Sequence, residues 1–290
     1  MDLSRILIHI PKFLLRMKIR GGTRLMLAMA RRIGGLQSYW IEIGGRRLYV
    51  DLRNAGTHAI LMRADTPSEE KVLLERCVRA GDIVYDIGAN AGLFTIWLSR
   101  LVGSRGKVFS FEPNPAHKTG LEKTAAEAGN ICFFPLGLAD EKGSFELFVP
   151  EDDTMSSLNN WTNGEGGKVS KTTCEVTTID SLVEEGVIDH PAFIKCDIEG
   201  GELDCFKGAQ AMLDRADAPV MLFEANINCS KGYGRSILSA YDFLASLGAP
   251  AYSFFLLKAD AKLEPISGIA FDHGNILAVP SARMDEMGLL

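Results

Sequence analysis

The first chemically informative stretch is residues 84–92, where Asp86, Gly88 and Gly92 stand at the end of an apolar run. A glycine at position 88 permits backbone angles that a Cβ forbids. Gly92 lets a ligand or a strand come close to the first turn of a following helix. The free N–H groups of that turn and the helix dipole favour a negatively charged group. This stretch therefore predicts a ligand-binding turn between a strand and a helix.

A second acid follows at an informative distance. Glu112 comes twenty residues after Gly92 and ends the apolar run of residues 108–111. An acid at that offset suits the two hydroxyls of a ribose. The glycine spacing is G-x-x-x-G, whereas a dinucleotide site needs G-x-G-x-x-G, and Asp86 would repel a pyrophosphate. Asp86 instead suits an ammonium or sulfonium group, so the predicted cofactor is S-adenosylmethionine (SAM). A βα turn that binds no ligand is the alternative.

The second chemically informative stretch is residues 194–202. Because side chains alternate along a strand, Lys195, Asp197 and Glu199 are expected on one side of it. Three charges there are costly to bury without partners or a ligand. Ligands of open α/β sheets bind beyond the carboxyl ends of strands, and a carboxylate there can take the proton of a reacting hydroxyl. We predict that these three residues are catalytic. A buried ion pair that only orients the loop is the alternative.

Alternating strands and helices are expected to position both stretches, which predicts an α/β fold with a mostly parallel seven-stranded sheet. The expected strands of this sheet are residues 83–87, 108–111, 131–135, 192–197, 220–225, 251–256 and 275–279, and the expected helices are residues 93–101, 115–128, 178–185, 202–213 and 236–247. A hairpin at residues 39–51 and a helix at residues 69–78 precede them. Two added strands, residues 143–149 and 169–176, flank a long polar loop.

Charge divides the chain unevenly. The net charge is −6, yet residues 1–35 hold eight basic residues and one acidic residue. Residues 1–38 are therefore predicted to form a basic amphipathic helical arm. It would contact an anionic membrane surface as a peripheral element, or pack on its own domain or on a second copy in a homodimer. The acidic remainder disfavours nucleic acid as a partner. Six cysteines without a C-x-x-C pair predict reduced thiols and a cytoplasmic protein, peripheral at the inner face of the membrane if the arm binds there.

Taken together, these motifs resemble the FkbM-type SAM-dependent methyltransferases. The resemblance rests on residues 84–92, 112–114, 156–158, 178–182, 194–202 and 206–209, and it covers roughly residues 45–280. It implies a Rossmann-like class I methyltransferase domain at residues 39–290, with its core at about residues 67–280, and helices on both faces of the sheet. It also implies O-methylation of a hydroxyl on a sugar, a glycan or another secondary metabolite. The chain departs from the family at Gly201, where a bulkier small residue is usual.

Carried across by position, the resemblance implies that the glycine loop and Asp86 hold the methionine part of SAM, and that Glu112 holds the ribose. The implied cofactor-binding residues are Asp86, Gly88, Ala89, Asn90, Gly92, Glu112, Pro113 and Asn114. Asp197 and Glu199 would face the acceptor.

The polar loop at residues 150–168 is predicted to cover the acceptor, since polar groups beside an aromatic ring suit a sugar. A mobile surface loop is the alternative. The predicted substrate-binding residues are Ser156, Ser157, Trp161, Glu202 and Glu224. No metal is expected, although Asp197 with Glu224 or Asn226 would offer a divalent cation hard oxygen ligands. A degenerate methyltransferase fold that serves as a scaffold is the main alternative function, and a nicotinamide-dependent oxidoreductase is a more distant one.

Overall fold

The computed structural model of the chain describes residue 32 and residues 37–64, 66–163, 165–266 and 271–286. The basic arm predicted at residues 1–38 lies almost entirely outside the described residues, so its membrane and dimer roles and the domain boundary at residue 38 stay predictions. Among the described residues, no helix is long and apolar enough to span a membrane. All six cysteines are free thiols and five of them are buried, as expected.

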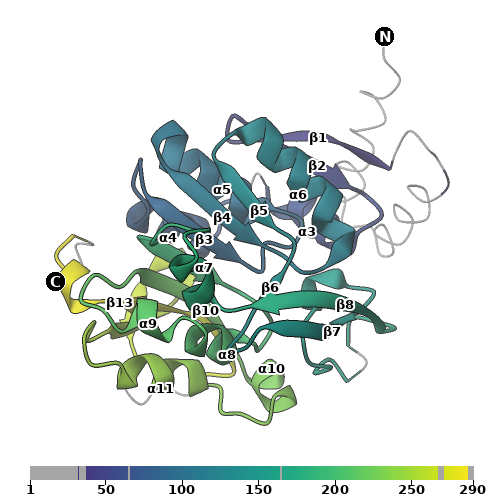
Figure 1. Ribbon diagram of the computed structural model, residues 1–290. Helices are drawn as coiled ribbons and strands as arrows, with labels where there is room; N and C mark the ends of the chain where they lie inside the picture. The colour runs from purple at the N-terminus through teal and green to yellow at the C-terminus, as the bar shows by residue number, and fades with distance from the viewer. Residues whose placement is uncertain (1–31, 33–36, 65, 164, 267–270, 287–290) are drawn as a thin grey trace.

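A central eight-stranded sheet organises the described chain (Figure 1). Its order is β12 (Leu263–Pro265), β11 (Ser253–Leu257), β13 (His273–Val279), β10 (Val220–Asn226), β9 (Phe193–Cys196), β3 (Ile83–Ile87), β4 (Lys107–Phe111) and β5 (Ile131–Phe134). The five strands from β10 to β5 run parallel, whereas β13 is antiparallel to both of its neighbours. The predicted parallel α/β fold is confirmed. The short edge strand β12 is the one strand of this sheet that the sequence pattern missed.

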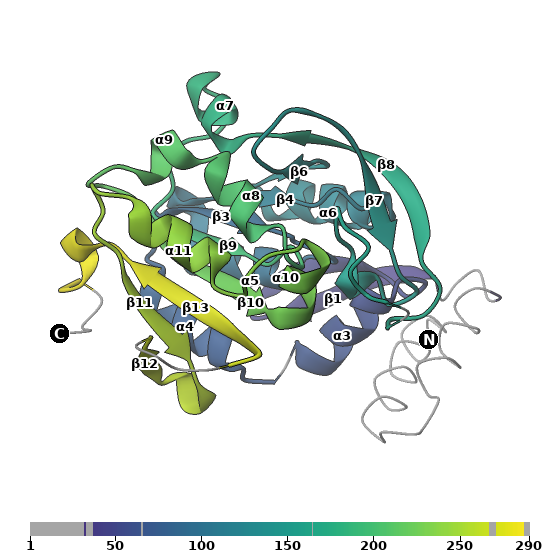
Figure 2. The same cartoon turned by 90° about the horizontal axis from the view of Figure 1, so that it is seen from below.

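Helices cover both faces of this sheet because its strands are apolar on both faces (Figure 2). One face packs against α4 (Glu69–Cys77), α5 (Leu93–Val102) and the hairpin of β1 (Ser38–Ile43) and β2 (Arg46–Asp51), with α6 (Pro115–Ala128) alongside. The other face packs against α7 (Ile179–Glu184), α8 (Glu202–Lys207), α9 (Gln210–Leu213) and α11 (Ser239–Ser246). The result is three layers, with the carboxyl ends of the parallel strands open along one edge.

Local sequence explains where these helices begin and end. Ser68 accepts a hydrogen bond from the backbone N–H of Lys71 at 3.3 Å and so caps α4. Asn114 caps α6 by accepting from the N–H of Ala116, and Pro115 occupies the first helical turn. The single helix predicted at residues 202–213 is instead two helices. The break falls at Gly208, where a Cβ would lie 1.9 Å from the carbonyl oxygen of Ala139.

A smaller three-stranded sheet lies beside the carboxyl edge (Figure 1). It consists of β6 (Gly137–Leu138), β8 (Ser170–Thr177) and β7 (Gly143–Val149), in that order. The predicted long loop joins β7 to β8, and a short 3-10 helix, Asp153–Met155, turns it back toward the central sheet. Two helices were not predicted from the sequence: α3 (Ala55–Arg63) and α10 (Ile227–Gly232).

Candidate functional site

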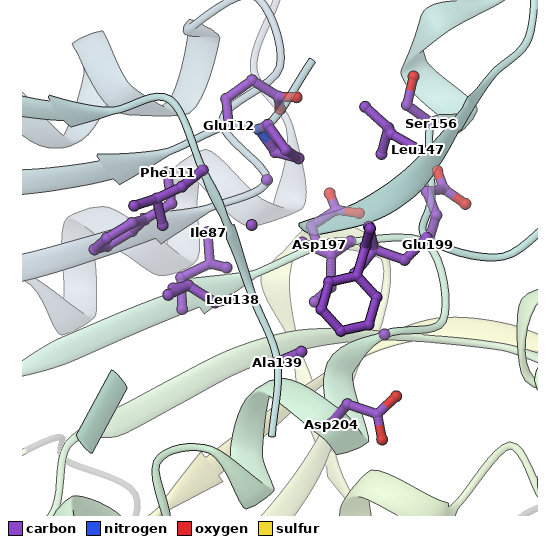
Figure 3. Close-up of a pocket in the computed structure, with 18 of the residues that line it drawn as sticks. Ile87, Phe111, Glu112, Leu138, Ala139, Leu147, Ser156, Asp197, Glu199 and Asp204 are labelled. Atoms are coloured by element: carbon purple, nitrogen blue, oxygen red, sulfur yellow. The ribbon is translucent and has the colours of Figure 1, made fainter. Parts of the chain in front are cut away.

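A cavity of about 310 Å³ opens at the carboxyl ends of β3, β4 and β9 (Figure 3). Its wall combines residues of the glycine loop, the β4 and β9 exits, the small sheet, the β7–β8 loop and the segment after α10. The polar lining residues are Asn90, Glu112, Asp140, Glu141, Asp153, Thr154, Ser156, Asp197, Glu199, Asp204, Tyr233 and Arg235; the larger apolar ones are Ile87, Phe111, Leu136, Leu138, Phe145, Leu147, Leu158 and Ile198. The cavity therefore joins the two stretches that the sequence singled out.

The glycine loop takes a backbone path that requires its glycines. Gly88 has φ +80°, and a Cβ there would lie 1.9 Å from the carbonyl oxygen of Asp197. The loop can therefore pass directly against the exit of β9. Gly92 has φ +92° at the start of α5, where a Cβ would meet the Leu121 side chain at 2.9 Å. Gly88 lines the cavity, whereas Gly92 and Ala89 do not, so these two shape the loop from behind.

Glu112 ties the glycine loop to the exit of β4. One carboxylate oxygen accepts the backbone N–H of Asn90 at 2.7 Å, and the other accepts that of Asn114 at 2.8 Å. Burial raises the pKa of Glu112, while His117 and these two donors lower it. Glu112 and Pro113 line the cavity, and the ribose contact of Glu112 stays a prediction. Asn114 lies behind the wall as a helix cap.

Asp86 is placed differently from the prediction. Its side chain is fully buried and does not line the cavity, so a direct contact with the methionine part of SAM is not what the structure shows. Strand alternation points it toward α5, where it accepts a hydrogen bond from the Thr95 hydroxyl at 2.5 Å. Its Oδ1 atom has no hydrogen-bond partner within the described part of the chain. Burial raises the pKa of Asp86, and the neighbouring Lys195 opposes that shift.

Lys195 was predicted to be catalytic, but it does not line the cavity. It is buried, lies beside Asp86 across the β3–β9 pair, and stacks over the Phe94 ring at 4.6 Å. Its ammonium group donates to Asp197 at 3.1 Å. Burial lowers the pKa of Lys195, but Asp197 and Asp86 outweigh that and raise it, so the side chain stays charged. It holds one oxygen of Asp197 and never reaches the cavity.

Asp197 and Glu199 both line the cavity, but their surroundings differ. The Asp197 side chain is 38% exposed at the cavity and ion-paired with Lys195. Glu199 has φ +56°, which breaks the predicted alternation and turns its carboxyl toward β10 and α10. There the Cys229 thiol donates to it at 3.2 Å. Burial, aided by Glu224 and Asp197, raises the pKa of Glu199 to about 9. Of the two acids, Asp197 is therefore the one suited to accept a proton near neutral pH.

The predicted substrate-binding residues separate into two groups. Ser156 lines the cavity, and its hydroxyl accepts from the Asn114 side chain at 3.4 Å. Ser157 lies behind the wall, where its hydroxyl donates to the carbonyl of Glu199 at 2.9 Å. Trp161 is 4% exposed and does not line the cavity. Its Cβ lies 2.3 Å from where a Cβ of Gly232 would be, so its backbone and ring base pack on α10. The predicted contact of Trp161 with the acceptor is therefore not what the structure shows.

Glu202 and Glu224 also lie outside the cavity wall. Glu202 accepts the backbone N–H groups of Ile198 and Gly200 at 3.0 and 3.4 Å, and so fixes the β9–α8 loop. Burial raises the pKa of Glu202 to about 8. Glu224 lies behind Glu199, with one oxygen 2.7 Å from the ring nitrogen of His273. Glu202 therefore supports the loop that carries Asp197, whereas Glu224 contacts β13 through His273.

Sequence reasoning missed several lining residues. Arg235 forms two hydrogen bonds with Asp204, at 2.8 and 2.9 Å, across 31 residues of chain. No local pattern marked Arg235, because it follows the helix α10 that was itself not predicted. Of the apolar wall of Phe111, Leu136 and Leu138, only Phe111 lay in a predicted strand. Such a wall suits a flat ring, while the acids and hydroxyls around it suit hydroxyl groups.

The chain is similar to several known methyltransferases. The chain is 27% identical over 159 residues to the hexuronic acid methyltransferase AglP of Haloferax volcanii, a match that covers 54% of this chain and 62% of that protein. It also resembles the crystal structure of the methyltransferase FkbM from Methylobacillus flagellatus, at 19% identity, with a TM-score of 0.44, over 76% of this chain and 53% of that one. A SAM-dependent O-methyltransferase from Thermotoga maritima gives a TM-score of 0.40 at 12% identity, over 83% and 77% of the two chains.

The chain thus spans under two thirds of both the curated relative and the first of these structures. The family itself is decided by sequence, since residues 86–248 match the methyltransferase FkbM domain. That match includes Asp86, Gly88, Glu112 and Asp197, and it covers more than half of the chain. The chain therefore belongs to the methyltransferase FkbM domain family.

Proposed function

We propose that the protein is a SAM-dependent O-methyltransferase that acts on a hydroxyl of a sugar or glycan. The observation that carries this proposal is one cavity with Glu112 on one side of Gly88 and Asp197 on the other. Family membership supports methyl transfer, and the hexuronic acid named for the Haloferax relative supports a sugar acceptor.

The residues present fit SAM. Gly88 lines the cavity and packs against the Asp197 carbonyl with no room for a Cβ, so the glycine loop and the exit of β9 meet at one side of the site. Glu112 keeps acceptor lone pairs beside its two backbone donors, which suits ribose hydroxyls. The apolar wall of Phe111, Leu136 and Leu138 suits the adenine ring. When bound, SAM supplies a methyl group on a positively charged sulfur.

The work left to the chain is positioning and one proton transfer. Methyl transfer needs the acceptor oxygen in line with the methyl group, and holding two reactants in that geometry provides much of the rate enhancement. Asp197 accepts the hydroxyl proton, because its side chain is exposed at the cavity. Lys195 holds that carboxylate through one oxygen and leaves the other toward the cavity. Ser157 and Glu202 keep the loop around Asp197 in place through backbone contacts.

The test is a methyl-transfer assay with labelled SAM against neutral sugars, hexuronic acids, glycans and lipid-linked sugars. A labelled product from the wild type, lost in the Asp197→Asn variant, would support the proposal. Calorimetric titration of SAM separates it from the scaffold alternative. A folded protein that binds no SAM would contradict the proposal, and so would SAM binding without labelled product from any acceptor.

A further inference from the structure

A second group of side chains meets behind the cavity wall. Glu199 from the β9–α8 loop, Glu224 from β10 and Cys229 from α10 each place one potential ligand atom within 4.8 Å of the others. The shortest of these contacts joins the Cys229 thiol and a Glu199 oxygen at 3.2 Å. Three separate elements bring these atoms together, so their meeting reflects the tertiary fold.

A histidine extends the group. His273 at the start of β13 lies opposite Asn226 in the strand pair, and its Nε2 atom is 2.7 Å from Glu224 Oε1. Its side chain is 61% exposed, so the ring has room to turn. Two carboxyls and a thiol thus converge, and the imidazole pairs with one of these carboxyls. The group differs from an ordinary acidic patch because one of its three members is a sulfur ligand.

The ion pair with His273 reaches only one oxygen of Glu224. Glu224 Oε2 is a buried acceptor that receives no hydrogen bond from any described residue. The buried ammonium group of Lys195 already donates a hydrogen bond to Asp197 at 3.1 Å. Burial disfavours the charge of two carboxyls held this close. A bound positive ion would stabilise their charged forms and would give the free oxygen of Glu224 a partner.

We propose that Glu199, Glu224 and Cys229 form a binding site for a divalent transition metal of the zinc class, with His273 as the partner that orients Glu224. Zinc is bound by cysteine sulfur and carboxylate oxygen, and sites with three protein ligands keep a water in the fourth position. Magnesium prefers six oxygen ligands and keeps several waters, which a thiol does not match. The site lies at the β10 side of Glu199, so it is separate from the residues proposed to hold SAM. The inference does not depend on methyl transfer.

The experiment uses the untagged full-length protein, stripped with a chelator and then dialysed. Calorimetric titration with Zn²⁺ should show one tight site, and Mg²⁺ should bind far more weakly. Cobalt(II) replaces zinc as an optical probe, and it should give the absorption of a cobalt–thiolate bond. None of these measurements needs SAM or an acceptor, so failure here is distinct from failure of the proposed methyltransferase activity.

Two ligand variants and one control make the result specific. Cys229→Ser and Glu199→Gln should each weaken zinc binding by more than about tenfold, since even outer partners of metal ligands change affinity by about 10–100-fold. Cys229→Ser should also remove the cobalt–thiolate absorption. The control Cys132→Ser removes a thiol on β5, four strands away from β10, and should change neither measurement. No tight zinc binding by the wild type, or wild-type affinity in either folded ligand variant, would overturn the proposal.

Discussion

The two ends of the cavity hold their acids in different ways. At the glycine-loop end, each carboxylate oxygen of Glu112 receives a backbone N–H, at 2.7 and 2.8 Å. At the β9–α8 end, Asp197 depends on the Lys195 side chain and Glu199 on the Cys229 thiol. Backbone donors are fixed by the fold, whereas side-chain partners compete and change protonation. The geometry of the glycine-loop end is therefore fixed before any ligand binds. The charge of the β9–α8 end depends instead on what occupies it.

Asp197→Asn should give the largest effect, and it tests the chemical role of the β9–α8 end. The amide keeps the size of the side chain but cannot take a proton, so turnover should fall by roughly 10²–10⁴, the usual contribution of a general base. SAM affinity should stay within a few-fold, because the SAM contacts are assigned to the other end. Steady-state kinetics with an acceptor found by the screen and SAM calorimetry measure the two effects. Retained turnover would remove Asp197 from the mechanism.

Gly88→Ala should disturb both ends at once, because the added Cβ would lie 1.9 Å from the Asp197 carbonyl oxygen. The backbone strain alone costs about 1–3 kcal/mol, and the clash adds to it. Gly81→Ala is the matched control, since Gly81 also has a positive φ, +98°, but nothing within 4 Å of its Cβ position. Denaturant unfolding compares the two. An equal loss of stability in both variants would mean that the close approach at Gly88 costs nothing.

Glu112→Gln tests the glycine-loop end. The variant keeps the shape but replaces one acceptor oxygen by an N–H₂ group that faces a backbone donor. SAM binding should weaken by about 1–3 kcal/mol, the scale for losing a hydrogen bond to a charged group or leaving a buried group unsatisfied. Calorimetry measures it, with Glu175→Gln on the exposed part of β8 as the control. Unchanged SAM affinity in the folded Glu112→Gln protein would rule out the ribose contact.

How well the sequence predicted each end follows from the same contrast. The glycine loop and Glu112 were found because one strand–turn–helix segment and a fixed offset determine their geometry. Asp86 was found but placed wrongly, since strand alternation turns it inward to Thr95. The strand positions were predicted closely because apolar runs mark buried strands directly.

The other end depends on contacts between distant segments. Trp161 was expected to contact the acceptor. It packs instead against Gly232 of α10, a helix that was not predicted. Arg235 pairs with Asp204 only once α10 and the following segment fold back over α8. Residue type and spacing cannot predict these contacts, because the contacts depend on how the loops pack against the sheet. Arg235 and the place of Trp161 were therefore missed at the end that is built from side chains of many elements.

The smallest predicted effect concerns the contact between the glycine-loop end and the loop that covers it. His117 on α6 is 3% exposed and lies 3.6 Å from Asp153 of the 3-10 helix. Burial lowers the pKa of His117 below its usual value of 6.5, although Glu112 and Asp51 oppose the shift. Above pH 6.5 the imidazole is neutral in both the folded and the unfolded chain, so it adds no pH dependence there.

Below pH 6.5 the imidazole of His117 binds a proton in the unfolded chain but not in the folded chain. Stability therefore falls as the pH falls toward the lowered pKa of His117. The slope from this one group is at most about 1.4 kcal/mol per pH unit. Burial raises the pKa of Glu112, which contributes a slope of the opposite sign, so the wild type alone does not isolate the histidine. The difference between wild type and His117→Gln does, because the variant keeps Glu112 but cannot titrate at position 117. Urea unfolding between pH 7 and pH 5 should therefore show a smaller loss of stability in the variant. Parallel curves for the two proteins would show that the pKa of His117 is the same in the folded and unfolded chain, and a larger loss in the variant would show that Asp153 keeps the imidazole charged.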